Sequence, residues 1–240
     1  MCERFILKRN AKDSLRNFFG SALLVLIIQM GVQLVVSSIF SSEYFSISMD
    51  AMINSSYVGD GFAYGFSIRY VLMLLLTVFI TYPISVGVIG FFIDSRKKQT
   101  AVSTIFSIFK DKSCMNVAIT MLLKEIYIAL WSLLFVIPGL VKNYEYYFIP
   151  YILAEHPDMS RREAFQLSRE MTSGYKWDIF VFELSFLFWH IGALFTFGLL
   201  YIYLAPYQHA AFTELYECLK ANYERKHTNI EYTGGMENII

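Results

Sequence analysis

The chain has 240 residues, which is the length of one domain or at most two. Hydrophobic residues make up 56% of it and charged residues 17%, whereas soluble domains have about 45–50% and about 25%. The 20 Lys and Arg residues balance the 20 Asp and Glu residues, which excludes a strongly basic nucleic-acid-binding protein. The apolar excess excludes a disordered chain, and three Cys are too few for a disulfide scaffold. A membrane protein or an unusually apolar soluble core remains.

Long apolar segments decide between these two classes. A helix needs about 20 mostly apolar residues to cross a hydrocarbon core about 30 Å thick. Residues 18–40 and 70–93 contain no charged residue, so both are expected to span a membrane. Three further spans are expected at residues 117–137, 177–196 and 197–216, although each of them contains charged residues. The sequence therefore predicts an all-α, polytopic membrane protein that forms a single domain over residues 1–240.

The distribution of basic residues predicts the topology. Nearly all Lys and Arg residues lie in the N-terminal arm, the loop after the second span, residues 155–176 and the C-terminal tail. Positive charge marks the cytoplasmic side of a membrane, so these segments and both termini are expected in the cytoplasm. Residues 138–154 must then return across the membrane, which makes six spans. A re-entrant hairpin through residues 117–154 satisfies the same charges, so this second arrangement stays open.

A short amphipathic helix is expected at about residues 160–173, on the cytoplasmic side. Ser160 and Glu163 have the spacing of a capping box, in which each side chain accepts a hydrogen bond from the backbone amide of the other residue. Gly174 is placed to end the helix, because glycine adopts the left-handed conformation without strain. Anchoring to the membrane surface is its simplest role.

Several prolines and glycines are expected to shape the spans. Pro83 and Pro206 should bend their helices, because proline removes a helix hydrogen bond. Pro138 and Gly139 should form a tight turn on the outer side of the membrane. Gly198 is the residue best suited to the tight turn between the last two spans.

Four ionisable residues inside the expected spans form a candidate intramembrane polar site: Lys124, Glu125, Glu183 and His190. A charge in hydrocarbon is costly, so each of them is a functional hypothesis by default. Lys124 and Glu183 lie at similar depths from the same side, and they are expected to approach each other as an ion pair. Glu183 and His190 share a helical face and could pass protons. A purely structural role is the simpler interpretation of all four residues.

A second group of charges is expected near the outer end of the membrane. Lys142 and Glu145 are three residues apart, so they lie on one helical face and can form a local pair. Arg69, in the loop between the first two spans, could join them. Positioning of the charged heads at the membrane interface is the alternative interpretation.

Recognisable catalytic motifs are missing from the sequence. It contains no P-loop motif, no H-E-x-x-H, no G-x-S-x-G and no G-x-G-x-x-G, and its four His are dispersed. No catalytic residue, metal site or cofactor is therefore expected, and the chain is predicted not to be an enzyme.

The motifs in the second half of the chain carry a family resemblance. The segment Phe135-Val136-Ile137-Pro138-Gly139-Leu140-Val141-Lys142 is followed by Tyr151-Ile152-Leu153-Ala154-Glu155-His156-Pro157-Asp158-Met159-Ser160 and then by Lys176-Trp177-Asp178. This pattern resembles the centre of domain-of-unknown-function 975, a family of bacterial integral membrane proteins. The resemblance is strongest from about residue 130 to 216. It implies a multi-span protein of the bacterial cytoplasmic membrane, and it implies no activity.

Two functions remain after these observations. The first is a non-enzymatic six-helix protein of the membrane that acts as a scaffold, an accessory protein or a stress or immunity factor, with the lipid bilayer and another protein as partners. The second is a small transporter or permease subunit that uses Lys124, Glu125 and Glu183. A transporter predicts a water-filled cavity lined by these charges, whereas a scaffold predicts a packed interior in which the charges pair with neighbours.

Overall fold

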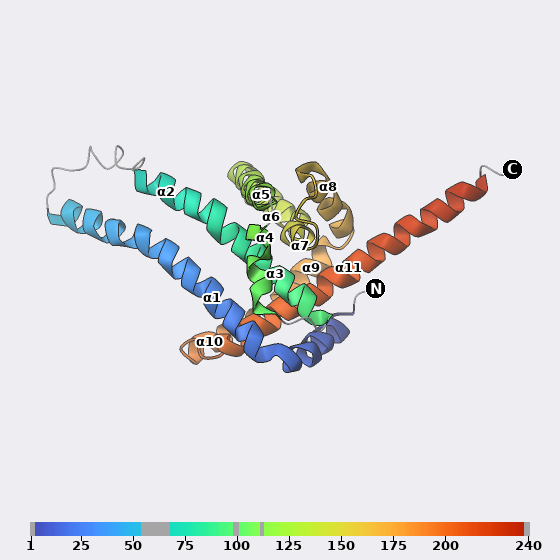
Figure 1. Cartoon of the computed structure of the whole chain (residues 1–240), viewed down its shortest axis with the longest axis horizontal. Helices are drawn as coiled ribbons and strands as arrows, with labels where there is room; N and C mark the ends of the chain where they lie inside the picture. The colour runs from blue at the N-terminus through green and yellow to red at the C-terminus, as the bar shows by residue number, and fades with distance from the viewer. Residues whose placement is uncertain (1–2, 54–67, 98–100, 111–112, 238–240) are drawn as a thin grey trace.

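The computed structural model describes the backbone of residues 3–53, 68–97, 101–110 and 113–237. Side chains are described for residues 3–38, 71–97, 101–109 and 113–228. The structure is 88% helical, and the described residues include no strand (Figure 1). The all-α prediction is therefore confirmed.

The described helices occur in the following order along the chain. The first half of the chain contains α1 (Arg4–Ile53), α2 (Ile68–Leu76), the π-helical turn η4 (Thr77–Thr81), α3 (Tyr82–Arg96), the 3₁₀-helix η5 (Val102–Phe106) and α4 (Ser107–Lys110). The second half contains α5 (Cys114–Leu134), α6 (Val136–Glu145), α7 (Ile149–Glu155), α8 (Arg161–Thr172), α9 (Lys176–Leu184), α10 (Leu187–Phe195) and α11 (Tyr201–Glu237).

Four helical stretches of the described chain are long and apolar enough to cross a membrane. They are Arg4–Ser38, Val71–Arg96, Cys114–Leu134 and Lys176–Phe195. These stretches overlap four of the six predicted spans. The other two are not among them: residues 138–154 are divided between α6 and α7, and residues 197–216 include the start of α11. The structure thus supports a membrane protein with at least four helices of spanning length.

The first two of these stretches are not regular α-helices along their whole length. In α1, Phe18 leaves the helical conformation (φ −134°, ψ 20°), so the basic N-terminal arm forms a separate helical segment before the apolar one. Pro83 lies in the first turn of α3, directly after η4. The second stretch therefore changes its helix type at the position where a bend was predicted. Pro206 lies inside α11.

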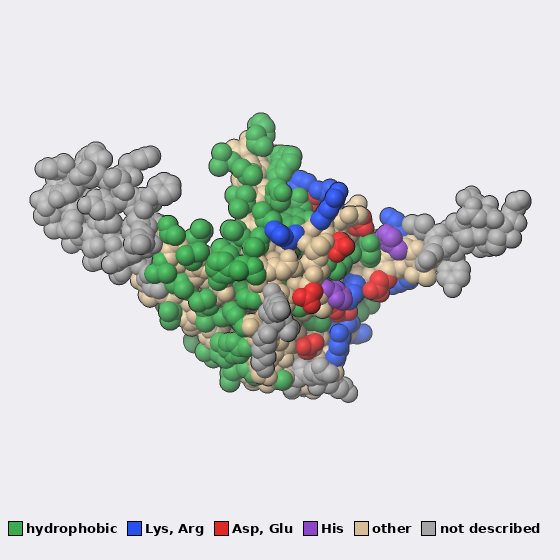
Figure 2. Space-filling model, turned by 45° about the horizontal axis from the view of Figure 1, so that its top comes forward, with side chains coloured by type: hydrophobic (Ala, Val, Ile, Leu, Met, Phe, Trp, Pro, Cys, Tyr) green, Lys and Arg blue, Asp and Glu red, His purple; other side chains and the backbone are tan. Residues whose placement is uncertain are grey.

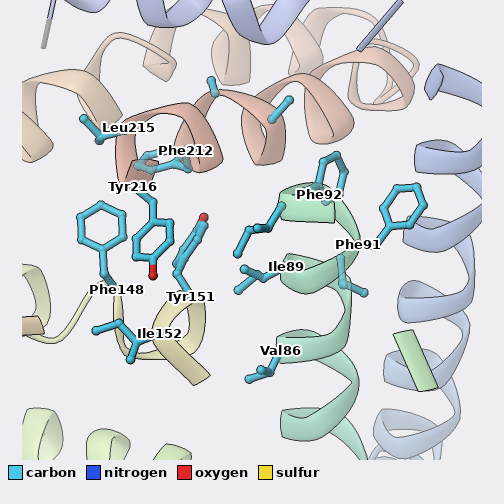
Figure 3. Packing of buried hydrophobic residues seen from close by; sticks show 14 of the residues in the cluster. Val86, Ile89, Phe91, Phe92, Phe148, Tyr151, Ile152, Phe212, Leu215 and Tyr216 are labelled. Carbon is cyan, nitrogen blue, oxygen red and sulfur yellow. The ribbon is translucent and has the colours of Figure 1, made fainter. Parts of the chain in front are cut away.

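The buried hydrophobic cluster includes the region where α3, α7 and α11 meet (Figure 3). The rings of Phe148 and Tyr151 each pack against Tyr216 of α11, with centroid separations of 5.7 and 5.2 Å. On the other side, Phe92 of α3 stacks on His209 at 5.2 Å. Aromatic contacts of this kind fix the three helices relative to one another.

Helices α5 and α6 form a hairpin whose turn consists of one residue. Phe135 is extended (φ −155°, ψ 142°), its N–H donates to the carbonyl of Trp131 and its carbonyl accepts from the N–H of Gly139. The turn therefore lies three residues before Pro138–Gly139. The prediction that Pro138 and Gly139 form the turn is wrong, because both residues lie inside α6.

The role of Gly139 is to let the two helices approach. A Cβ atom at this position would lie 2.3 Å from Ser132 Oγ and 2.7 Å from Ser132 Cα. The predicted turn at Gly198 is present, with φ +85° at Gly198 and φ +50° at Phe197. Gly174 also has the expected left-handed conformation (φ +82°), two residues after α8 ends.

The close approach at Gly139 makes the hairpin sensitive to one methyl group. We expect Gly139→Ala to lower the thermal unfolding midpoint of the detergent-purified protein, because overpacking of this kind costs about 1–3 kcal/mol. Gly90→Ala is the matched control, because its added Cβ would meet Ala154 at an ordinary 3.7 Å. Equal unfolding midpoints for the two variants would show that α5 and α6 accommodate the added methyl group without loss of stability.

Candidate functional site

The helix predicted at 160–173 is present as α8, with the predicted capping box. Ser160 Oγ accepts from the Glu163 amide, and the Ser160 amide donates to Glu163 Oε2, both at 3.3 Å. The buried face of α8 packs on α6, α7 and α11. Its other face carries Arg161, Arg162 and Arg169, which are exposed. The helix therefore connects the buried cluster to a basic surface.

Glu145, at the C-terminal end of α6, is the centre of a buried ion cluster. Its side chain is 6% exposed and accepts hydrogen bonds from Lys142 at 2.9 Å, Arg169 at 2.8 Å and Lys176 at 2.7 Å. Ser168 Oγ and Thr172 Oγ1 donate to its backbone carbonyl. Burial raises the pKa of Glu145, but the hydrogen bonds from the three cations outweigh burial and hold the pKa at about 2.

Two further ion clusters lie around α11. Glu155 Oε2 accepts from Lys220 and from the Tyr216 hydroxyl, both at 2.6 Å. Burial raises the pKa of Glu155, but these two hydrogen bonds outweigh burial and lower it below the ordinary value. Arg96, at the end of α3, donates to Glu214 at 2.7 Å and pairs with Glu217 at 3.2 Å.

We call the part of the molecule that holds these clusters the ionic end. Its members come from α3, α6, α7, α8, α9 and α11: Arg96, Lys142, Glu145, Glu155, Arg169, Lys176, Glu214, Glu217 and Lys220. Figure 2 shows that Lys, Arg, Asp, Glu and His side chains gather on one side of this face of the molecule, whereas apolar side chains predominate among the described side chains on the other side. This separation is typical of a protein that has one end in water and the other in lipid.

The predicted ion pair between Lys124 and Glu183 is wrong. In the described structure, Lys124 Nζ donates to Glu125 Oε1 at 3.1 Å, and Glu183 Oε2 accepts from the Tyr144 hydroxyl at 2.7 Å. The reason is the order of packing, because α6 packs against both α5 and α9. Glu183 of α9 therefore meets a residue of α6, and Lys124 of α5 pairs within its own helix.

The predicted alignment of Glu183 with His190 is also interrupted. The helix breaks at Ser185 and Phe186, between α9 and α10, so the seven-residue spacing no longer places the two side chains on one continuous face. His190 Nδ1 lies 3.0 Å from the Tyr201 hydroxyl. Within the described part of the chain, the four candidate intramembrane residues therefore belong to three separate local contacts.

The predicted pair between Lys142 and Glu145 is present, but it does not lie on the opposite side of the membrane from residues 155–176, as the predicted topology required. Glu145 bonds to Arg169 and Lys176, which belong to the segment assigned to the cytoplasmic side. The pair must therefore lie on the same side as α8. The side chain of Arg69 lies outside the described residues.

The surface pockets also lie toward the ionic end. One is lined by residues of α5 and α8 and by Tyr146, directly after α6. Three flank residues 214–227 of α11 together with α1, α3, α8 or α9. Lys124, Glu125, Glu183 and His190 line none of these four pockets. Among the described residues, no three His, Cys, Asp or Glu side chains are grouped so as to hold a metal ion.

Sequence analysis did not identify the ion pairs of Arg96, Glu155 and Glu214. Glu214 carried a signal, because it is a carboxylate in an otherwise largely apolar segment and therefore needs a partner. Its partner Arg96 lies 118 residues earlier in the chain, at a distance that no local pattern spans.

Removal of the Glu145 charge tests the cluster. We expect Glu145→Gln to lower the free energy of unfolding by about 3 kcal/mol, because three cations then surround a neutral side chain. Asp158→Asn, at an exposed carboxylate, is the control. Loss of stability is read from the thermal unfolding midpoint in detergent, and an equal change in both variants would contradict the role of Glu145.

The pH dependence has a defined sign. The pKa of Glu145 is lowered from 4.5 to about 2, so the stability that its charge supplies is present above about pH 4.5 and is lost as the pH falls toward 2. The difference in unfolding midpoint between the wild type and Glu145→Gln should therefore shrink from about pH 7 to about pH 3. A difference that stays constant over this range would contradict the assignment.

Comparison with known proteins finds a family match for part of the second half of the chain. The family model described as "Protein of unknown function (DUF975)" matches residues 133–223, whereas no curated protein and no solved structure gives a significant match. The matched segment runs from the tip of the α5–α6 hairpin into α11 and includes Glu145, Glu155 and Glu214. The resemblance found in the sequence is therefore confirmed over this segment, which is similar to the DUF975 family of proteins of unknown function.

Proposed function

We propose that the chain is a non-enzymatic integral membrane protein of the bacterial cytoplasmic membrane that acts as a scaffold or accessory factor through its ionic end. The observation that carries this proposal is the pairing of the candidate intramembrane charges. Lys124 pairs with Glu125 and Glu183 with Tyr144, and neither pair lines a pocket named above. Ionisable side chains that are bonded to fixed neighbours favour a structural role over a transport pathway.

The proposed topology places the ionic end and both termini in the cytoplasm. Its support is the positive charge of the N-terminal arm, of α8 and of the region around Lys220. The apolar part of α1, the α2–α3 stretch, the α9–α10 stretch and the part of α11 before Glu214 then cross the membrane. The pockets that flank α11 at the ionic end are concave surfaces that a protein partner can contact.

The hairpin of α5 and α6 is better explained as re-entrant than as two crossings. From Ile126 to Val141 it carries no charge, and its tip exposes Leu133, Leu134, Phe135, Val136 and Ile137. A turn in the outer headgroup region would expose these apolar side chains to water. From the tip to Glu125 or to Lys142, each limb rises only about 10–15 Å, which is at most half of the hydrocarbon core.

The backbone of the turn supports the same assignment. An exposed loop in hydrocarbon must satisfy its own polar groups. Phe135, the non-helical residue between α5 and α6, has both its N–H and its carbonyl bonded within the hairpin. The tip can therefore lie in lipid without an unpaired backbone group at this residue.

Labelling of introduced cysteines distinguishes the two topologies. In a background without the three native Cys, we expect Ile137→Cys at the hairpin tip to resist a membrane-impermeant maleimide added to either side, and to react after detergent solubilisation. Phe197→Cys, at the fully exposed turn between α10 and α11, is the control and should react from the outside. Reaction of Ile137→Cys from the outside would support the six-span topology.

The transporter alternative makes an opposite prediction for purified protein. In proteoliposomes with an internal pH-sensitive dye and an imposed proton gradient, we expect the wild type to leak no faster than protein-free vesicles, because its intramembrane charges are paired. Glu183→Gln is the matched variant, because it removes the carboxylate bonded to Tyr144. Proton flux above background that Glu183→Gln abolishes would overturn the scaffold proposal.

A further inference from the structure

The groove between α5, α6 and α8 combines aromatic and basic side chains. It has a volume of about 710 Å³, which is within the usual range for ligand sites. Its floor is formed by Tyr127, Tyr146 and Phe165, whose rings contact one another at centroid separations of 5.0 to 6.4 Å. Arg161 and Arg162 line it on the α8 side.

The charge of this groove is positive and only partly compensated. Arg169 also lines it and uses Nε to bond Glu145, but 60% of its side chain is exposed. Glu170 is the one carboxylate among the residues that line the groove, and it is already bonded to Gln166 and to the Tyr223 hydroxyl. Arg161 and Arg162 are exposed and have no ion pair within the described residues. Two guanidinium groups are therefore free to bind an anion, and phosphate suits their planar, multiple donors.

An apolar stripe leads from this groove to the tip of the hairpin. Leu123 and Tyr127 line the groove, and Leu130 and Leu134 continue the same face of α5 at spacings of three and four residues. Leu130 and Leu134 are both exposed. Figure 2 shows Lys and Arg side chains beside the base of the apolar column that this hairpin forms. The surface thus has a cationic site at one end and about 16 Å of continuous apolar surface at the other.

We propose that this groove binds an anionic phospholipid, with its phosphate on Arg161 and Arg162 and an acyl chain along Leu123, Tyr127, Leu130 and Leu134. The inference depends on the arginines and the apolar stripe being next to each other. A soluble phosphate would contact the arginines but not the apolar stripe. The inference goes beyond the scaffold function and needs only that the hairpin contacts lipid. Phosphatidylglycerol is the probe, because it joins a phosphate of net charge −1 to two acyl chains.

The test measures lipid binding to the purified full-length chain in a mild detergent. Phosphatidylglycerol added as mixed micelles should raise the unfolding midpoint of the wild type in a saturable manner, whereas phosphatidylcholine should not. In Arg161→Gln/Arg162→Gln the half-saturating concentration should rise at least about tenfold, because basic residues near an anionic lipid each contribute about 1 kcal/mol. Arg225→Gln/Lys226→Gln removes the same charge from the exposed part of α11 and should change it less than about threefold.

Further measurements distinguish a phospholipid from a soluble phosphate and control for misfolding of the variants. Inorganic phosphate and glycerol 3-phosphate should give no comparable shift at the same concentrations, and Arg161→Lys/Arg162→Lys should keep most of the affinity. The proposal is overturned by an equal response to phosphatidylcholine, by equal losses in the two double Gln variants, or by an equal response to free phosphate. If the Gln variant does not fold without lipid, the Lys variant and Leu130→Ser decide the outcome. Leu130→Ser should weaken the binding of phosphatidylglycerol without any loss of charge. Unchanged binding in Leu130→Ser overturns the proposal.

Discussion

The buried carboxylate of Glu145 is the constraint on which the second half of the structure depends. Transfer of an isolated carboxylate from water to a protein interior costs far more than one ion pair returns. Glu145 is accommodated because three cations converge on it from α6, α8 and α9. Its backbone carbonyl is bonded to two hydroxyls of α8 as well. If α8 or α9 moved away, Glu145 would lose Arg169 or Lys176 as a partner.

The same cluster determines which predicted contacts form. Because Glu145 holds the end of α6 against α8 and α9, α6 meets α9 directly and Tyr144 reaches Glu183. Lys124, on α5, then pairs with its neighbour in the sequence. The pairing of Lys124 with Glu183 was predicted from their similar depths below the membrane surface. Depth does not show which helices are neighbours. Depth along a helix is a local property, whereas helix order is a property of the whole fold.

The features that were predictable have local causes. The capping box of Ser160 and Glu163, the left-handed Gly174 and Gly198 and the long apolar stretches each follow from a few adjacent residues. The hairpin turn was placed three residues too late, because proline and glycine are typical of turns but also suit a first helical turn and a close helix contact. The pairs of Arg96 with Glu214 and of Glu155 with Lys220 join residues far apart in the chain, so no local pattern could reveal them.

On the proposed topology, Glu145 also determines how deep the hairpin enters the membrane. Its partners on α8 and α9 keep it at the ionic end, and α6 rises about 15 Å from there to Phe135. That distance is half of a hydrocarbon core of about 30 Å, so the tip ends near the middle of the bilayer. The stripe from Leu123 to Leu134 then covers the depth of one leaflet, which is the depth that the acyl chains of a single phospholipid occupy. The anchoring of one carboxylate thus matches the apolar surface of the hairpin to the lipid beside it and leaves the arginines of α8 at the level of the headgroups.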